Sequence, residues 1–202
     1  MTGRTLHWVS GEGVAMTEEN RKPGVPAFAI AVVATALALA ASRLISVSGD
    51  ASLIWPPLGI AVGLMLVWGG WGLVAVCGGL ALWLVITGHN LLLLPIACLE
   101  VAFGAWATLV LNRRLQRAQG TALAATVRLY VAGALVGGGV SALIGAGSFH
   151  LAGIFPDMSF STLFLVFWVA EAMGMLVFGG LTLALARDGI VALRPDATLA
   201  LR

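Results

Sequence analysis

The sequence predicts an all-α fold, a polytopic integral membrane bundle of about six transmembrane helices, on two observations. Hydrophobic residues make up 60% of the chain and charged residues only 10%, against the roughly 25% charged residues of soluble domains. The apolar residues also come in runs of bilayer-spanning length. Because these runs do not alternate with polar residues, they argue against a β-barrel.

We expect six spans, of which the second and third are short for a bilayer at 1.5 Å of rise per residue. Tryptophans flank these short spans, as in the aromatic belt of membrane proteins. The predicted spans are Pro26 to Val47, Leu53 to Trp68, Gly72 to Thr87, Leu91 to Leu111, Val127 to Gly147 and Phe160 to Ala186.

The basic residues predict that both termini are cytoplasmic. With the N-terminus inside, ten of the eleven lysines and arginines fall on the cytoplasmic side, as the positive-inside rule requires. The exception is Arg43, near the outer end of the first span. Because the basic residues cluster beside the apolar runs, we interpret them as signals of membrane topology rather than as a surface for nucleic acid. The expected partner is therefore the lipid bilayer of a bacterial inner membrane.

The ends of the chain are predicted to be cytoplasmic tails, residues 1–25 and 187–202, around a membrane domain of residues 26–186. Residues 1–25 are polar and lack the pattern of a signal peptide. Translation beginning at Met16 is a further hypothesis, because Gly11, Glu12 and Gly13 would be encoded by purine-rich codons just upstream.

The second span opens with Trp55, Pro56 and Pro57, followed by Gly59. Prolines are tolerated in the first turn of a helix, where their missing N–H would have no partner anyway. Trp55 is expected to anchor this start at the outer interface.

Small residues recur every four positions on two spans, at Gly59 and Gly63 and at Gly137, Ser141 and Gly145. Such stripes allow close helix packing, which replaces the hydrophobic driving force that is missing in lipid. We therefore interpret them as packing surfaces rather than as phosphate-binding loops.

Two carboxylates lie near the middle of spans, Glu100 in the fourth and Glu171 in the last, where Trp168 and Gly174 flank Glu171. Ionisable residues at such a depth normally face a partner or a wet cavity. If the two helices touch, repulsion in a low dielectric leaves the pair sharing a proton. Arg43 is a possible counter-charge. A neutral polar clamp and a ligand-sensing or ion-binding site remain equally open.

No catalytic or metal site is expected. The histidines His89 and His150 are assigned to outer links without ligand spacing, and Cys77 and Cys98 lie inside apolar segments as small hydrophobes. No nucleophile and base arrangement is present, so an enzyme is not expected. The sequence indicates no particular cofactor.

Four stretches of this chain resemble the first type of the bacterial membrane-associated sensor domain, MASE. They are Ile54 to Ala61, Leu99 to Leu115 with its Ala105-Trp106 and Arg113-Arg114 pairs, Ser141 to Gly153, and Trp168 to Gly174. Eight positions match the family pattern, namely Trp55, Pro56, Pro57, Gly59, Glu100, Trp168, Glu171 and Gly174. The chain departs from the family pattern in three ways. It has six predicted spans where the family often has about eight. It has Val169 where a second tryptophan is common and Glu171 where the acid is usually aspartate, and no output domain is expected.

The resemblance implies a membrane input module that normally precedes a histidine kinase, a diguanylate cyclase or a similar output. We therefore expect a sensory module that perceives a small ligand or partner within its helices and relays it to a cytoplasmic signalling partner. Glu171 is the expected switch or ligand contact and Glu100 its neighbour. The other residues expected in the ligand or relay site are Arg43, Trp168 and Gly174. One alternative is a substrate-binding subunit similar to those of energy-coupling-factor vitamin importers. Another is a noncatalytic structural subunit of a larger membrane complex.

Overall fold

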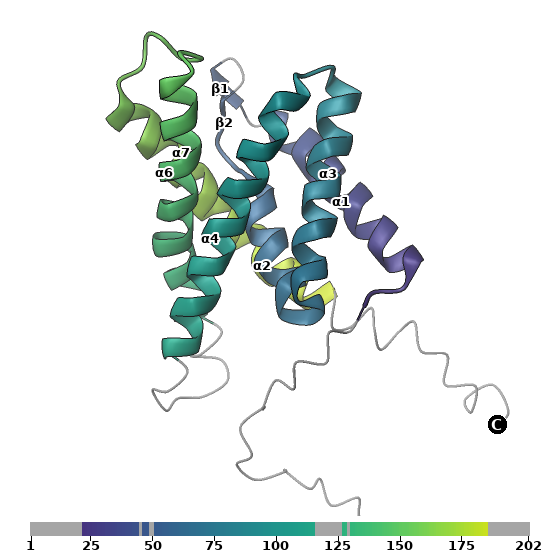
Figure 1. Ribbon diagram of the computed structural model, residues 1–202. Helices are drawn as coiled ribbons and strands as arrows, with labels where there is room; N and C mark the ends of the chain where they lie inside the picture. The colour runs from purple at the N-terminus through teal and green to yellow at the C-terminus, as the bar shows by residue number, and fades with distance from the viewer. Residues whose placement is uncertain (1–21, 45, 49–50, 116–126, 129, 186–202) are drawn as a thin grey trace, which may run out of the picture.

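The computed structural model confirms an all-α membrane bundle (Figure 1). It describes residues 22–44, 46–48, 51–115, 127–128 and 130–185, so the predicted tails and Met16 lie largely outside the described residues. Within these ranges five helical segments are long and apolar enough to cross a membrane. They are Val25–Arg43, Gly70–Thr87, Leu91–Leu115, Tyr130–Leu151 and Phe160–Leu185. The remaining predicted span, the second in the chain, is a shorter helix, α2 (Pro56–Trp68).

The first and third spans are single helices, α1 (Val25–Arg43) and α3 (Gly70–Thr87). The other three change winding along their length. The fourth begins with a 3-10 turn, Leu91–Leu93, and continues as α4 (Leu94–Leu115). The fifth has a π-helical segment, Gly133–Gly137, before α6 (Gly138–Leu151), and the last has α7 (Phe160–Gly174) before a π-helical segment, Met175–Gly179.

The link between the first two spans differs from the prediction. The helix α1 ends at Arg43 rather than Val47, and a small antiparallel hairpin follows, β1 (Ser46–Ser48) and β2 (Ala51–Ser52). The second helix begins at Pro56 rather than Leu53. Trp55 has an extended backbone, which is the conformation that a following proline favours.

The helix α2 occupies the centre of the bundle, and its start lies about halfway along it (Figure 1). Residues 56 to 64 are all buried, so the first turns of α2 have no face toward lipid. A helix that is apolar all round is typical of such a buried position. The short length of α2 therefore follows from its place inside the bundle, where it does not need to reach both surfaces.

The two prolines suit a helix that begins away from water. A helix leaves its first N–H groups without intrahelical partners, and in a membrane interior each such group is costly. Pro56 and Pro57 remove two of these donors at the first two positions of α2. The N–H of Trp55 donates to the carbonyl oxygen of Ala170 in α7, at 2.9 Å.

The predicted small-residue stripe of α2 packs against the end of the last span. A Cβ added at Gly59 would collide with the carbonyl group of Gly174, and one added at Gly63 would lie 2.8 Å from the Cβ of Thr182. Only glycine allows the two backbones to come this close. This packing joins α2 directly to the last helix.

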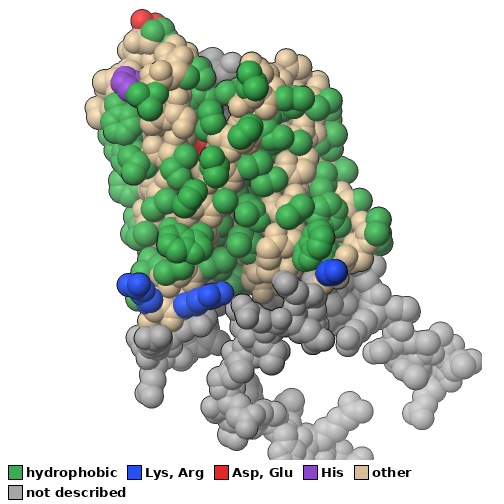
Figure 2. Space-filling model, viewed as in Figure 1, with side chains coloured by type: hydrophobic (Ala, Val, Ile, Leu, Met, Phe, Trp, Pro, Cys, Tyr) green, Lys and Arg blue, Asp and Glu red, His purple; other side chains and the backbone are tan. Residues whose placement is uncertain are grey.

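Cationic side chains gather at one end of the bundle (Figure 2). Lys22 precedes α1, and Arg113 and Arg114 lie in the last turn of α4. An acidic side chain and a histidine mark the opposite end in the same view, and the surface between them is hydrophobic. This distribution agrees with a bundle that crosses a bilayer from end to end.

Candidate functional site

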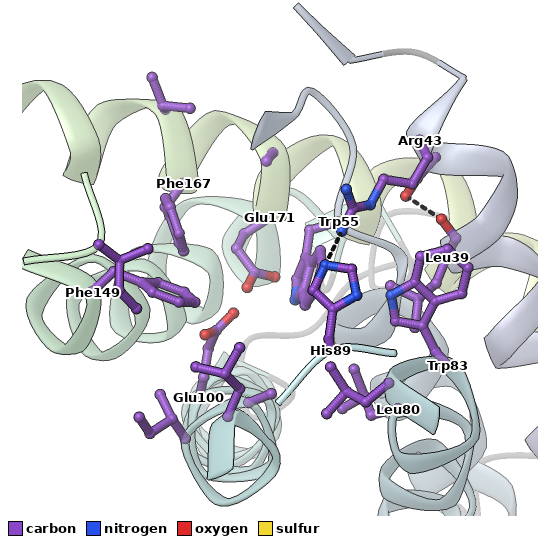
Figure 3. Close-up of a pocket in the computed structure, with 18 of the residues that line it drawn as sticks. Leu39, Arg43, Trp55, Leu80, Trp83, His89, Glu100, Phe149, Phe167 and Glu171 are labelled. Atoms are coloured by element: carbon purple, nitrogen blue, oxygen red, sulfur yellow. Dashed lines mark hydrogen bonds between the residues drawn. The ribbon is translucent and has the colours of Figure 1, made fainter. Parts of the chain in front are cut away.

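A pocket of about 240 Å³ opens between α1, α3, α4, α6 and α7 (Figure 3). Its polar lining contains Ser42, Arg43, Trp55, His89, Glu100 and Glu171. The rest of the lining is mostly aliphatic and aromatic. The volume is slightly below the ~300–1,000 Å³ of sites for drug-sized molecules, so the pocket has room for a small organic molecule.

The two carboxyl groups point toward each other in this pocket, one from α4 and one from α7 (Figure 3). Glu100 is 2% exposed and Glu171 is 1% exposed, so both carboxyl groups are removed from solvent. The structure thus brings together the two acids whose pairing the sequence predicts. We call Glu100 and Glu171 the acid pair.

The helix α6 holds both members of the acid pair through its small-residue stripe. The hydroxyl of Ser141 donates a 2.7 Å hydrogen bond to Oε1 of Glu171. One turn later, a Cβ added at Gly145 would lie 3.0 Å from the carboxyl carbon of Glu100. The stripe is therefore a packing surface, as predicted, and it also provides a hydrogen bond to one acid and space for the other.

Three polar atoms of the pocket residues are buried without a hydrogen-bond partner. They are Nε1 of Trp55, Oε1 of Glu100 and Oε2 of Glu171, and they are the buried side-chain atoms of this kind in the described part of the chain. Buried polar groups are nearly always hydrogen-bonded, because an unsatisfied group costs about 1–3 kcal/mol. One donor and two acceptor oxygens thus surround the same space with unused bonding capacity.

Arg43 lines the same pocket and is held by a chain of polar contacts. Its Nη2 lies 3.3 Å from Nε2 of His89, and its guanidinium carbon lies 5.7 Å from the centre of the Trp83 ring. Nδ1 of His89 lies 2.6 Å from Oγ1 of Thr87, whose hydroxyl donates to the carbonyl of Trp83. Since arginine can only donate, His89 accepts at Nε2 and carries its proton on Nδ1.

Trp55 contributes to the pocket wall, which corrects its predicted place as an anchor at the outer interface. Its indole lies in the pocket beside the acid pair (Figure 3). Its carbonyl group touches Gly174, where a Cβ would collide with it. Gly174 therefore acts through packing, by letting the start of α2 reach α7.

Trp168 lies outside the pocket lining. Its Nε1 donates to the carbonyl oxygen of Leu135 at 3.0 Å, and its ring stacks on Phe164. Leu135 belongs to the π-helical segment Gly133–Gly137. Trp168 thus connects two helical segments by a hydrogen bond and does not contribute to the pocket. The other predicted site residues Glu100, Glu171 and Arg43 share the pocket.

A cluster of three aromatic rings forms the apolar wall of the pocket, which we call the phenylalanine wall: Phe149, Phe155 and Phe167. The ring of Phe149 lies 5.5 Å from that of Phe167 and 6.1 Å from that of Phe155, centre to centre. Sequence reasoning did not identify these residues, because scattered phenylalanines in a membrane helix carry no signal of their own. It also assigned His89 to the surface, whereas the structure places it in the pocket.

In the part of the chain that the structure describes, no three histidine, cysteine, aspartate or glutamate side chains gather closely enough to hold a metal ion. Cys77 and Cys98 are free thiols. The polar groups of the pocket suit hydrogen bonding and charge recognition of an organic molecule.

The comparison with protein families agrees with this architecture. The family model of MASE1 matches residues 24–192, which is most of the chain. No curated protein and no solved structure matches the chain. MASE1 domains are membrane-associated sensor domains. The chain belongs to the MASE1 family and is a multi-pass membrane sensor domain.

Proposed function

We propose that the pocket takes up a small molecule and that its occupation moves the last helix, whose cytoplasmic end a signalling partner reads. The observation that carries this proposal is the position of Glu171, which lines the pocket and belongs to the last span. A ligand can shift a conformational equilibrium only through contacts that differ between the two states. A buried carboxylate provides a large difference when its partner changes.

The path from Glu171 to the end of the helix is short. Gly174 contacts the start of α2, and the π-helical segment Met175–Gly179 follows immediately. Such segments are frequent at functional sites because they interrupt the regular α-helical hydrogen bonds. We infer that a change at Glu171 alters the packing of Gly174 on Trp55 and is passed on to Leu185.

The proposed orientation places the cationic end of the bundle in the cytoplasm, as the positive-inside rule predicts. Lys22, Arg113 and Arg114 then lie on the same side as the end of the last span, and the His89 end of the pocket faces outward. MASE1 domains usually occur with cytoplasmic signalling domains. A kinase or a cyclase on the cytoplasmic side is thus the expected partner, and the chain itself has a sensory rather than a catalytic role.

We call the proposed transmission of a change at Glu171 to the cytoplasmic end of the last span the relay. It can be tested without knowing the ligand or the partner. In a variant whose native cysteines are alanine, spin labels at Arg113 and Leu185 report the distance between the cytoplasmic ends of α4 and the last span. Both positions are exposed, so the labels disturb little packing. Pulsed electron spin resonance is measured in liposomes for this protein with and without Glu171→Gln.

We expect Glu171→Gln to shift the distance by about 2 Å, the size of helix displacements in known switches. Asp157→Asn is the matched control, since it removes an exposed carboxylate outside the pocket lining. An unchanged distance distribution in Glu171→Gln would exclude the relay.

A further inference from the structure

We propose that the pocket binds a small organic monocation, with its charged group held by the acid pair and its apolar body against the phenylalanine wall. This inference rests on the proposed function, since it names the class of molecule that the sensor would take up. It is drawn from the charge, the unsatisfied atoms and the walls of the pocket.

The charge of the acid pair points to a cation. Two facing carboxylates that are each at least 98% buried repel each other in a low dielectric, so one proton is shared between them. One negative charge then remains in the interior of the bundle. Arg43 also lines the pocket but does not bond to the unsatisfied oxygen of either acid, so a cationic group beside these oxygens would balance the charge, whereas an anion there would add to the repulsion.

The unsatisfied atoms give the charged group its bonding partners. Apart from the proton that the pair shares, Oε1 of Glu100 and Oε2 of Glu171 are buried without a hydrogen-bond partner among the described residues, and Arg43 bonds to neither atom. An ammonium group carries several donors, and it can bond to both oxygens at once. An acceptor atom next to the ammonium would in addition satisfy Nε1 of Trp55.

The walls define the rest of the molecule. The phenylalanine wall and aliphatic side chains such as Leu80 and Ile96 line the remainder of the pocket. An apolar body would bury its surface there, and the aromatic rings also attract a cation electrostatically. The volume of about 240 Å³ accommodates a body the size of one ring with a short side chain.

The test compares three probes of nearly the same shape that differ in charge. They are 2-phenylethylamine, which is a cation at neutral pH, the neutral 2-phenylethanol, and the anion phenylacetate. Each is used in radiolabelled form with the full chain in lipid nanodiscs, and binding to empty nanodiscs is subtracted. We expect saturable binding of the amine, at least about tenfold tighter than binding of the alcohol, and no saturable binding of the anion.

Variants of the acid pair assign the preference to these two residues. The double variant Glu100→Gln with Glu171→Gln leaves no carboxylate in the pair and should abolish the preference for the amine over the alcohol, whereas each single variant keeps one carboxylate and should retain part of it. Asp157→Asn, the control outside the pocket, should bind all three probes as the natural chain does. Circular dichroism and gel filtration of each variant show whether the bundle is folded.

Equal binding of the amine and the alcohol to the natural chain would overturn the proposal, because a water-filled pocket without charge recognition predicts that result. Absence of saturable amine binding would overturn it as well. The relay can fail separately. If the amine binds as expected but Glu171→Gln leaves the spin-label distance unchanged, the ligand class stands and the relay is wrong. If the distance changes but the amine is not preferred, the relay stands and the ligand class is wrong.

Discussion

The backbone N–H of Trp55 donates a 2.9 Å hydrogen bond to the carbonyl oxygen of Ala170, in the middle of the last span. This bond places the start of a buried helix beside Glu171, the next residue along the chain. Because α2 is buried over its first nine residues, it cannot move without its neighbours. The start of the central helix thus contacts the last span beside Glu171, through this hydrogen bond and through Gly174 one turn further along.

The contact between Gly174 and Trp55 should be sensitive to one methyl group. In Gly174→Ala the new Cβ collides with the carbonyl of Trp55, which we expect to lower the free energy of unfolding by about 1–3 kcal/mol. Gly147→Ala is the control, because a Cβ there meets nothing within 4 Å. Removing a helical glycine should stabilise this control by up to ~1 kcal/mol. Thermal unfolding in detergent micelles measures both, and equal effects would contradict the close packing of α2.

The prolines at the start of α2 should matter because that start is buried. Pro57→Ala introduces an N–H group without a helical acceptor into the bundle, at an expected cost of about 1–3 kcal/mol. Pro26 occupies the same second position in α1 but is exposed, so Pro26→Ala should change the stability far less. Unfolding by sodium dodecyl sulfate in mixed micelles compares the two variants. A similar cost for both would argue that α2 begins in contact with water.

Replacing one member of the acid pair by an amide should stabilise the protein. A functional pair of buried carboxylates is expected to cost stability, and an amide of the same shape keeps hydrogen-bonding capacity without the repulsion between two acids. We therefore expect Glu100→Gln to raise the free energy of unfolding by on the order of 1 kcal/mol. The measurement is thermal unfolding in micelles without added ligand. A marked loss of stability would instead identify the pair as a structural clamp.

The pocket should be reachable by a water-soluble reagent from the end that carries His89. In a variant whose native cysteines are alanine, Ala97→Cys places a thiol in the lining, whereas Ala105→Cys on the same helix is fully buried outside it. We expect Ala97→Cys to react with a charged methanethiosulfonate reagent at least about tenfold faster, because the reaction requires an accessible thiolate. 2-Phenylethylamine should slow it. Equal rates for the two positions would show that the pocket is closed to water.

Much of the fold was predictable because the bilayer constrains it so strongly. The lengths of the apolar runs indicate the spans, since every backbone group within lipid must be paired inside a helix. The small-residue stripe at Gly137, Ser141 and Gly145 predicts close packing, because such packing replaces the hydrophobic driving force that is missing between helices in lipid. The second span was predicted to begin too early, at Leu53, because an apolar run does not show where a helix starts inside a bundle.

The candidate site was predictable only in part. Glu100 and Glu171 are conspicuous, because carboxylates in apolar runs are rare, and their central positions placed them at a similar depth. His89 and Phe149 are ordinary residues for their positions in the sequence, so nothing distinguished them from solvated or packing residues. They belong to the pocket only because α3, α4 and α6 bring them to the same space.

The sequence by itself therefore determined the class of protein, its helices and the two acids that need a partner, because these follow from the cost of polar groups in lipid. Only the tertiary structure decided that the two acids meet, that Trp55 lies beside them, and that Arg43 is held by His89 at the same pocket. The physical reason is that helices in a bilayer all have apolar surfaces, so hydrophobicity does not determine which helices pack together. Close packing of small residues and a few hydrogen bonds determine it instead. Those contacts join residues far apart in the chain, as between Ser141 and Glu171.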